Sequence, residues 1–197
     1  MTSPAPLDLD DLLDRVKSGE RLPHATVEQI VAAIHDPTSP YPLYTLLHIL
    51  GRGFMVEHRP LMESFLDYRE DPMITSIALR SLTAYWGLHS DYLDDLTTFA
   101  RGVDWDDEDD VRIIALSQLG EYAREVHDIH VIRLLVEILD KEAEDELIRS
   151  FAVAAVARAL GHDHNEMPSA ARFEPLDSPW SVAIRKEAAD YLADARP

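Results

Sequence analysis

A phrase that returns every 37 residues constrains this 197-residue chain more than any other feature. Its clearest copies read Val111-Arg112-x-x-Ala115-Leu116-x-x-Leu119 and Ile148-Arg149-x-x-Ala152-Val153-x-x-Val156. Weaker copies begin at Ile74, one period upstream, and at Ile184, 36 residues downstream. A helical unit of this length cannot bury its apolar stripe alone, so neighbouring units stack on one another. The repeat therefore predicts an all-α fold, a solenoid of about five helical hairpins, with Ala115 and Ala152 buried where helices approach closely.

The repeat resembles a known family in its order of parts. An acidic turn, the phrase V-R-x-x-A-L-x-x-L-G, a polar break and a second apolar helix are similar to HEAT repeats of the phycobilisome-lyase type. The resemblance implies a single HEAT-like repeat domain over 1–197, with clear repeats in 71–161, degenerate N-terminal hairpins in 7–70 and a C-terminal cap in 178–195. It also implies that the second helix of each pair lines a concave face. It implies no reaction, because such repeats occur in scaffolds, regulators, inhibitors and enzymes.

Helix boundaries follow from apolar spacing and from residues that start or stop helices. Apolar residues spaced for one helical face predict helices over 9–16 and 27–34. Asp71 followed by Pro72 is typical of an N-cap residue and a first helical position, and Ser178 followed by Pro179 indicates that a helix restarts there. The two residues therefore predict the start of a helix at each place.

Acidic residues follow one face of the helix predicted over 89–101. Asp91, Asp94, Asp95 and Thr98 fall at i, i+3, i+4 and i+7, which places them on a common ridge. Like charges at this spacing repel one another by a few tenths of a kcal/mol per pair, a cost that a sequence carries easily. The ridge is thus a candidate binding surface.

The turn that follows, 103–110, is the most charged stretch of the chain and contains six acids and Trp105. Asp107 is placed to cap the helix that begins near Val111, and acids in a first turn complement the helix dipole. Six acids exceed that need. Trp105 is either exposed among them or packed over the neighbouring hairpin. The ridge and the turn together give the predicted partner-binding residues: Asp91, Asp94, Asp95, Trp105, Asp106 and Asp109.

The net charge limits the class of partner. With 37 acidic and 18 basic residues the chain carries −19. Such a field repels phosphate backbones and anionic lipid surfaces, so we expect neither nucleic acid nor membrane as the direct ligand. The charge favours a basic protein partner. The alternative is that the acidic surface only keeps a helical array soluble.

Other features bound location and chemistry. The chain has no cysteine, no signal-peptide pattern in 1–14 and no apolar run of roughly 18 residues, so we expect a cytoplasmic protein. His162-x-His164-x-Glu166 has the residue types of a metal site, but its spacing is that of an irregular loop. We therefore expect no metal and no cofactor.

Enzyme motifs are missing from the sequence. Iron-dependent hydroxylases with HEAT-like repeats use His-Glu pairs, whereas this chain has only the reverse order, at Glu57-His58. Nothing in the chain identifies a bilin pocket, the acidic balance opposes the basic groove of a HEAT-like DNA glycosylase, and G-x-S-x-G, P-loop and dinucleotide fingerprints do not occur. We assign no catalytic residue.

The expected function is protein binding. In size, charge and repeat style the chain looks like the immunity proteins that neutralise bacterial toxins, which implies an acidic inhibitor of a cationic protein. An adaptor or assembly scaffold is the alternative, and a lyase- or hydroxylase-like enzyme is the third. A toxin-like reading frame beside the gene would favour the first, and a biosynthetic cluster would favour the last.

Overall fold

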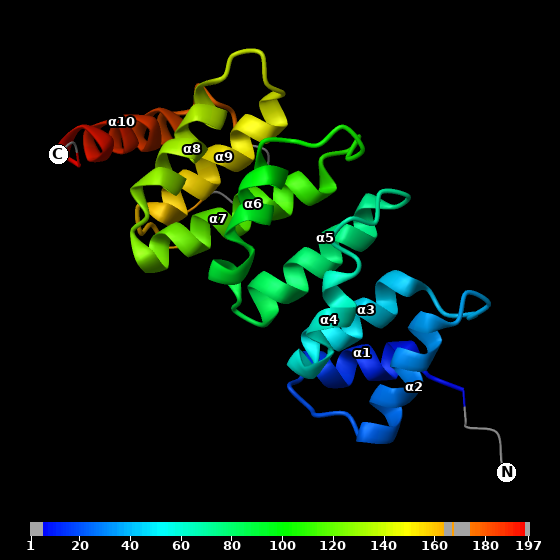
Figure 1. Ribbon diagram of the computed structural model, residues 1–197. Coiled ribbons are helices and arrows are strands. Elements are labelled where there is room, and N and C mark those ends of the chain that lie inside the picture. The colour runs from blue at the N-terminus through cyan, green and yellow to red at the C-terminus, as the bar shows by residue number, and fades with distance from the viewer. Residues whose placement is uncertain (1–5, 164–166, 168–173, 196–197) are drawn as a thin grey trace, which may run out of the picture. The chain divides into compact units, whose positions relative to one another are not determined.

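The computed structural model describes residues 6–163, 167 and 174–195 (Figure 1). These residues form ten α-helices and no strand, which confirms the all-α prediction for the part of the chain that is described. The chain divides into two compact units, residues 1–88 and 89–197. The solenoid and the single repeat domain remain predictions.

The first unit contains five helices and two short helical turns. In chain order they are α1 (Leu9–Lys17), α2 (His24–His35), α3 (Leu43–Arg52), the 3-10 turn η1 (Val56–His58), α4 (Arg59–Glu63), α5 (Pro72–Arg80) and the π-helical turn η2 (Ser81–Tyr85). Helices α3 and α5 lie side by side, and both also contact η2 (Figure 1). Leu46, Leu47 and Leu50 of α3 are buried and form much of the core of this unit.

The second unit contains the clearest copies of the repeat. Its elements are the 3-10 turn η3 (His89–Tyr92), α6 (Leu93–Ala100), α7 (Asp110–Val126), α8 (Ile129–Asp140), α9 (Glu146–Ala159) and α10 (Pro179–Asp194). Helix α9 packs against α7 and α8, while α10 packs against α8 and α9 (Figure 1). The two strongest copies of the phrase therefore lie on helices, α7 and α9, that contact each other directly.

Several helices begin where the sequence predicts. Asp71 accepts a hydrogen bond from the Met73 amide, which confirms it as an N-cap, and the structure shows that Ser178 caps α10 by accepting from the Ser181 amide. The carboxylates of Asp8, Asp128 and Asp145 cap their helices in the same way. An Asp cap contributes about 1 kcal/mol, so part of the acidic excess has a structural use.

The apolar positions of the phrase form the core between α7 and α9. Ala115 and Ala152 are both fully buried, as predicted, and the larger apolar residues of the two copies are at most 1% exposed: Val111, Leu116, Leu119, Ile148, Val153 and Val156. The copy on α10 is less complete, since Ile184 and Ala188 are buried but Ala189 is exposed. The periodicity therefore identified core positions correctly.

The arginine of the phrase also has a structural task. Nε of Arg112 donates to the Ala100 carbonyl at 3.1 Å, and Nε of Arg149 donates to the Leu139 carbonyl at 2.8 Å. Both acceptors lie at the end of the preceding helix, where carbonyls lack intrahelical partners. The copy on α10 departs from this pattern, because Nε and Nη2 of its arginine, Arg185, are buried with no acceptor among the described residues.

We expect Ala115→Leu and Ala152→Leu each to destabilise the second unit by about 1–3 kcal/mol. Both methyl groups are completely buried, so three additional heavy atoms must displace helix α7 or α9. Urea denaturation followed by circular dichroism measures the effect. Ala183→Leu, at an exposed position of α10, is the matched control and should change little. Unchanged denaturation midpoints for both core variants would contradict the close packing.

Candidate functional site

The predicted acidic ridge is at the surface of the second unit. The helix predicted over 89–101 is divided into η3 and α6, so Asp91 lies on a 3-10 turn, and Asp94 and Asp95 lie in the first turn of α6. Asp91 and Asp94 are exposed and Asp95 is half-buried. A 3-10 turn has 3.0 residues per turn rather than 3.6, so the α-helical spacing of the ridge holds only from Asp94 onward. Carboxylates of the ridge nevertheless reach solvent.

Trp105 combines the two situations that the sequence left open. It is half-buried, and the edge of its ring meets Phe99 of α6 with the ring centroids 6.0 Å apart and an angle of 81° between the planes. This edge-to-face arrangement is favourable for aromatic rings. Trp105 therefore packs over the end of α6 while part of its ring remains accessible between exposed Asp104 and Asp107.

Asp106 has a structural role that the sequence assigned to its neighbour. Its Oδ2 accepts hydrogen bonds from the amides of Val111 and Arg112, both at 3.0 Å, so Asp106 and not Asp107 satisfies the first turn of α7. The residue is only 5% exposed, and its Oδ1 is buried with no partner among the described residues. Burial raises the pKa of Asp106, and the two amide donors oppose that rise. Asp106 therefore lies inside the protein and not on the exposed acidic surface.

Asp109 is partly accessible to solvent and also has a structural contact. It is half-buried and sits at the start of α7 with φ of 58°, a left-handed conformation that Asp adopts more readily than most residues. Its Oδ1 accepts from Nη1 of Arg112 at 3.4 Å. Asp109 thus joins the acidic turn to an arginine of the core.

Arg112 forms shorter hydrogen bonds to a second carboxylate, that of Glu144, than to Asp109. Nη1 and Nη2 of Arg112 donate to the two oxygens of Glu144 at 3.0 and 2.7 Å, and both side chains are largely buried. The hydrogen bond from Arg112 is the main cause that lowers the pKa of Glu144 to about 2. Lys141 adds a contact to Glu144 at 3.0 Å. Paired bonds of this kind are stronger than single neutral ones and fix geometry.

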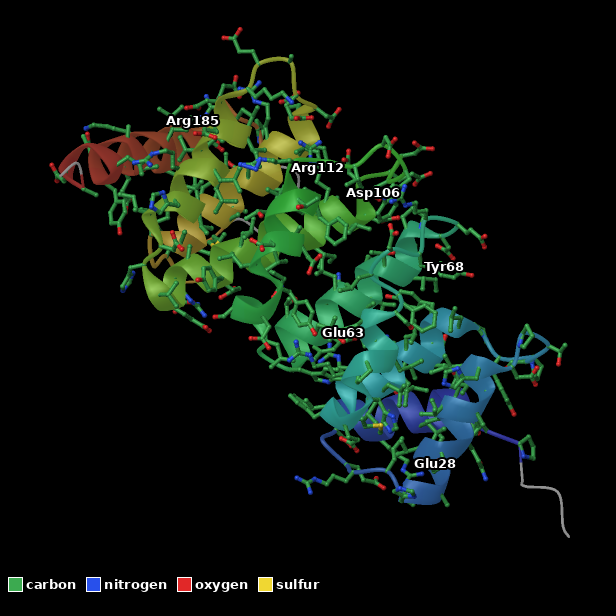
Figure 2. All side chains as sticks on the ribbon, in the orientation of Figure 1. Glu28, Glu63, Tyr68, Asp106, Arg112 and Arg185 are labelled. Atoms are coloured by element: carbon green, nitrogen blue, oxygen red, sulfur yellow. The ribbon has the colours of Figure 1, made fainter. Side chains whose placement is uncertain are left out.

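The Arg112–Glu144 pair brings a second acidic loop, between α8 and α9, next to the predicted 103–110 turn. Glu144 belongs to the α8–α9 loop, while Arg112 is in the first turn of α7, directly after the 103–110 turn, so both loops lie at one end of the second unit (Figure 2). The exposed acids of the two loops are, together, Asp104, Asp107, Glu108, Asp140, Glu142, Asp145 and Glu146. We call this set the acidic edge.

Of these two loops, only the 103–110 turn was predicted from the sequence as part of a binding surface. A signal for the second was present, because residues 140–146 lie one 37-residue period after 103–109 and contain five acids. The turn before Ile148 is therefore the repeat equivalent of the turn before Val111. The long-range contact between Arg112 and Glu144, 32 residues apart, could not be read from that periodicity.

The charge is concentrated in the unit that carries the acidic edge. Residues 89–197 hold 25 acidic and 11 basic residues, a net charge of −14, whereas residues 1–88 hold 12 acidic and seven basic residues, a net charge of −5. The two acidic loops alone place eleven acids at one end of the second unit. Charges on a common surface add to a long-range field that attracts cations and speeds their encounter.

The described residues offer no metal centre. No group of three or more His, Asp or Glu side chains within them could hold a metal ion. His162 contacts Glu187 at 2.9 Å, while His164 and Glu166 of the predicted cluster lie outside the described residues.

No family model, curated protein or solved structure matches this chain. The resemblance to HEAT repeats therefore rests on the repeat phrase alone. Among the described helices, none combines the length and the apolar character that crossing a bilayer requires.

Proposed function

We propose that the protein binds a cationic protein partner through the acidic edge and the neighbouring ridge on α6. The observation that carries this proposal is the junction of two acidic loops at one end of the second unit, held by the Arg112–Glu144 pair. Helix α6 has eight residues and so spans about 12 Å. The ridge and the edge are therefore close enough to contact one partner, since a standard protein interface buries about 800 Å² on each side.

The surface also offers features that an interface needs besides charge. The half-exposed ring of Trp105 lies among the acids, and aromatic residues are common anchors at the centre of interfaces. A cavity of about 300 Å³ beside the Arg112–Glu144 pair is lined by Leu134 and Ile138, with Arg101 and Lys141 among its other residues. In this proposal an apolar side chain of the partner enters the cavity, and basic residues of the partner on either side of that side chain contact the acidic edge.

The specific form that we propose is an inhibitor, such as an immunity protein that neutralises a basic toxin by charge complementarity. Its support is the size of the chain, its acidity and the repeat phrase. An adaptor or scaffold would use the same surface, so the identity of the partner decides between them. A toxin recovered as the partner, with its activity blocked by the complex, would establish the inhibitor.

The test is calorimetric binding to the isolated partner at low and at high salt. The edge triple variant is Asp107→Asn, Glu108→Gln and Glu142→Gln, and the ridge triple variant is Asp91→Asn, Asp94→Asn and Asp95→Asn. We expect at least one triple variant to lose affinity about tenfold or more, which equals ~1.4 kcal/mol. Wild-type affinity should fall steeply with salt, because exposed charges are screened.

A control with the same change in net charge separates a local site from a general effect. Glu125→Gln, Asp190→Asn and Asp194→Asn alter three exposed acids outside the edge and ridge and should leave affinity nearly unchanged. Binding that is indifferent to salt and to both test variants would mean that the charge serves solubility only, and the proposal would fail.

A further inference from the structure

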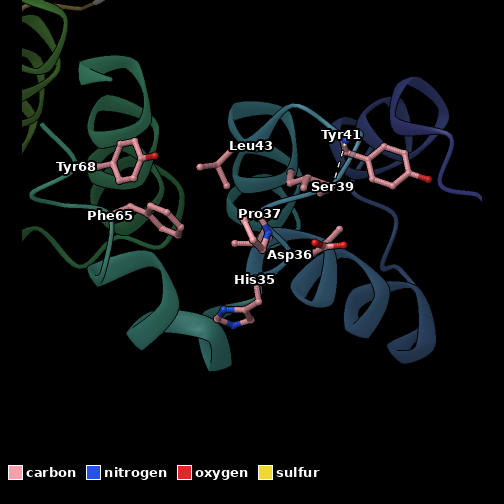
Figure 3. Close-up of a pocket in the computed structure, with 11 residues that line it drawn as sticks. His35, Asp36, Pro37, Ser39, Tyr41, Leu43, Phe65 and Tyr68 are labelled. Atoms are coloured by element: carbon pink, nitrogen blue, oxygen red, sulfur yellow. Dashed lines mark hydrogen bonds between the residues drawn. The ribbon is translucent and has the colours of Figure 1, made fainter. Parts of the chain in front are cut away.

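A groove in the first unit is independent of the acidic edge. One cavity, of about 560 Å³, lies between the end of α2, the start of α3 and residues 65–68 (Figure 3). A second, of about 390 Å³, continues towards the start of α5. Leu43 and Tyr68 line both, so the two cavities adjoin, and together they are called the groove. Volumes of this order are typical of ligand sites in proteins.

The walls of the groove are apolar and aromatic. Figure 3 shows the rings of Phe65 and Tyr68 on one side and Leu43 and Pro37 on the other, with open space between them. The two rings form a tilted pair with centroids 5.8 Å apart, and both are half-buried. Ile34 extends the apolar lining. An apolar side chain that enters here is desolvated on two sides.

The backbone that carries Phe65 and Tyr68 is hydrogen-bonded to the buried hydroxyl of Thr75. Oγ1 of Thr75, which is fully buried, donates to the Phe65 carbonyl at 3.1 Å and accepts from the Tyr68 amide at 3.2 Å. On the other side, the Tyr41 hydroxyl accepts from the Leu7 amide at 2.9 Å. The Thr75 bonds fix the backbone of the aromatic side of the groove, and a preformed site loses less entropy when it binds.

The charge around the groove has one sign. Three acidic residues line it, Asp36 in the first cavity and Glu70 and Asp71 in the second, and among the described residues neither cavity is lined by Lys or Arg. Hydrogen bonds from the Thr38 side chain and backbone lower the pKa of Asp36, so it stays ionised at neutral pH. Within the described part of the chain, His35 is the one residue with a basic side chain that lines the groove.

We propose that this groove binds an extended peptide segment of a protein partner, in which an apolar side chain is flanked by Lys or Arg. The apolar side chain lies between the Phe65–Tyr68 pair and Leu43, and the flanking cations meet the carboxylates at the two ends. Aromatic rings also attract cations and pack against the methylene stems of Lys and Arg. The proposal does not rest on the acidic edge, which lies in the other unit.

The test uses the full chain labelled with ¹⁵N and three blocked synthetic peptides. The first is Gly-Lys-Leu-Pro-Lys-Gly, the second replaces both lysines by Glu, and the third replaces Leu by Ser. We expect the first peptide to shift the amide signals of residues 43–44 and 65–70 in a saturable way. The other two should bind at least about tenfold more weakly, because each lacks one of the two kinds of contact.

Two variants place the binding in the groove. Tyr68→Ser removes one ring of the aromatic wall, and Glu70→Lys reverses an exposed charge without altering the core. Each should weaken binding of the first peptide at least about tenfold, whereas Tyr122→Ser, a half-buried tyrosine of α7, should not. The edge triple variant should also bind this peptide normally, so failure of the proposed function would leave this result intact.

Three outcomes would overturn the inference. Equal binding of the Glu peptide would remove the charge complementarity on which the choice of occupant rests. Shifts confined to residues 104–110 and 140–146 would place the peptide on the acidic edge instead. Groove signals that shift with protein concentration in the absence of peptide, and not with peptide, would mean that a second copy of the chain is the occupant.

Discussion

Replacement of Arg112 by alanine should lower the free energy of unfolding of the second unit by about 3–5 kcal/mol. The Arg112 side chain is only 8% exposed, and its guanidinium donates to the Ala100 carbonyl, to Asp109 and to both oxygens of Glu144. Its removal leaves the largely buried Glu144 carboxylate without its main partner, and that desolvated charge accounts for most of the loss. Urea denaturation followed by circular dichroism measures the change.

Arg149→Ala is the matched control for this prediction. Arg149 occupies the same position of the repeat phrase and donates to the Leu139 carbonyl at 2.8 Å, but no carboxylate pair is recorded for it within the described residues. Its replacement should cost only about 1 kcal/mol, the value of one ordinary hydrogen bond. The double variant Arg112→Met with Glu144→Met should recover much of the loss, because it leaves no unpaired charge. Equal losses for the two single arginine variants would contradict a special role for the pair.

The pair should also be sensitive to pH in one direction. The pKa of Glu144 is lowered from 4.5 to about 2 in the folded protein, chiefly by the hydrogen bond from Arg112. A lowered folded pKa contributes stability above the unfolded value, and that stability is lost as pH falls from about 4.5 to about 2. The difference in stability between wild type and Glu144→Gln should therefore be largest at neutral pH and shrink through this range.

Gly120→Ala should destabilise the second unit by about 2 kcal/mol or more, although alanine favours helix by about 1 kcal/mol over glycine. A Cβ at Gly120 of α7 would lie 2.7 Å from the Ala155 carbonyl oxygen and 2.9 Å from its Cα on α9. Both are backbone atoms, so no flexible side chain can move aside and the two helices must separate.

Ser117→Ala on the same helix is the control for Gly120→Ala. Ser117 is half-buried and makes no recorded contact of this kind, so its replacement should be neutral or stabilising by a few tenths of a kcal/mol. Urea denaturation of the two variants under the same conditions compares them. A stabilising Gly120→Ala substitution would show that α7 and α9 do not meet at this glycine.

The glycine of the repeat phrase illustrates how far the sequence can be read. The periodicity indicated that Leu119-Gly120 belongs to a repeated helix, and the small residues predicted close helix packing. That Gly120 meets the backbone of Ala155 is a tertiary fact, because it depends on where α7 crosses α9. The sequence predicted the kind of contact but not the contacting residue.

What the sequence by itself determined is local. Asp71-Pro72 and Ser178-Pro179 indicated the starts of α5 and α10, since these features depend on neighbours within a few residues. The repeated phrase also identified Ala115 and Ala152 as buried positions of its helices. The acidic ridge and the 103–110 turn were likewise visible as composition.

What only the tertiary structure decided is which of these local features meet. The left-handed conformation of Asp109 sets the path of the turn, and Asp106 rather than Asp107 reaches the amides of α7. Arg112 finds Glu144 across 32 residues, and so joins a second acidic loop to the first. The groove of the first unit is formed by residues 33–46 and 65–74, which are adjacent only after α2, α3 and α5 have packed. Side-chain partners at such separations are selected by the packing of helices, and local sequence carries no record of that choice.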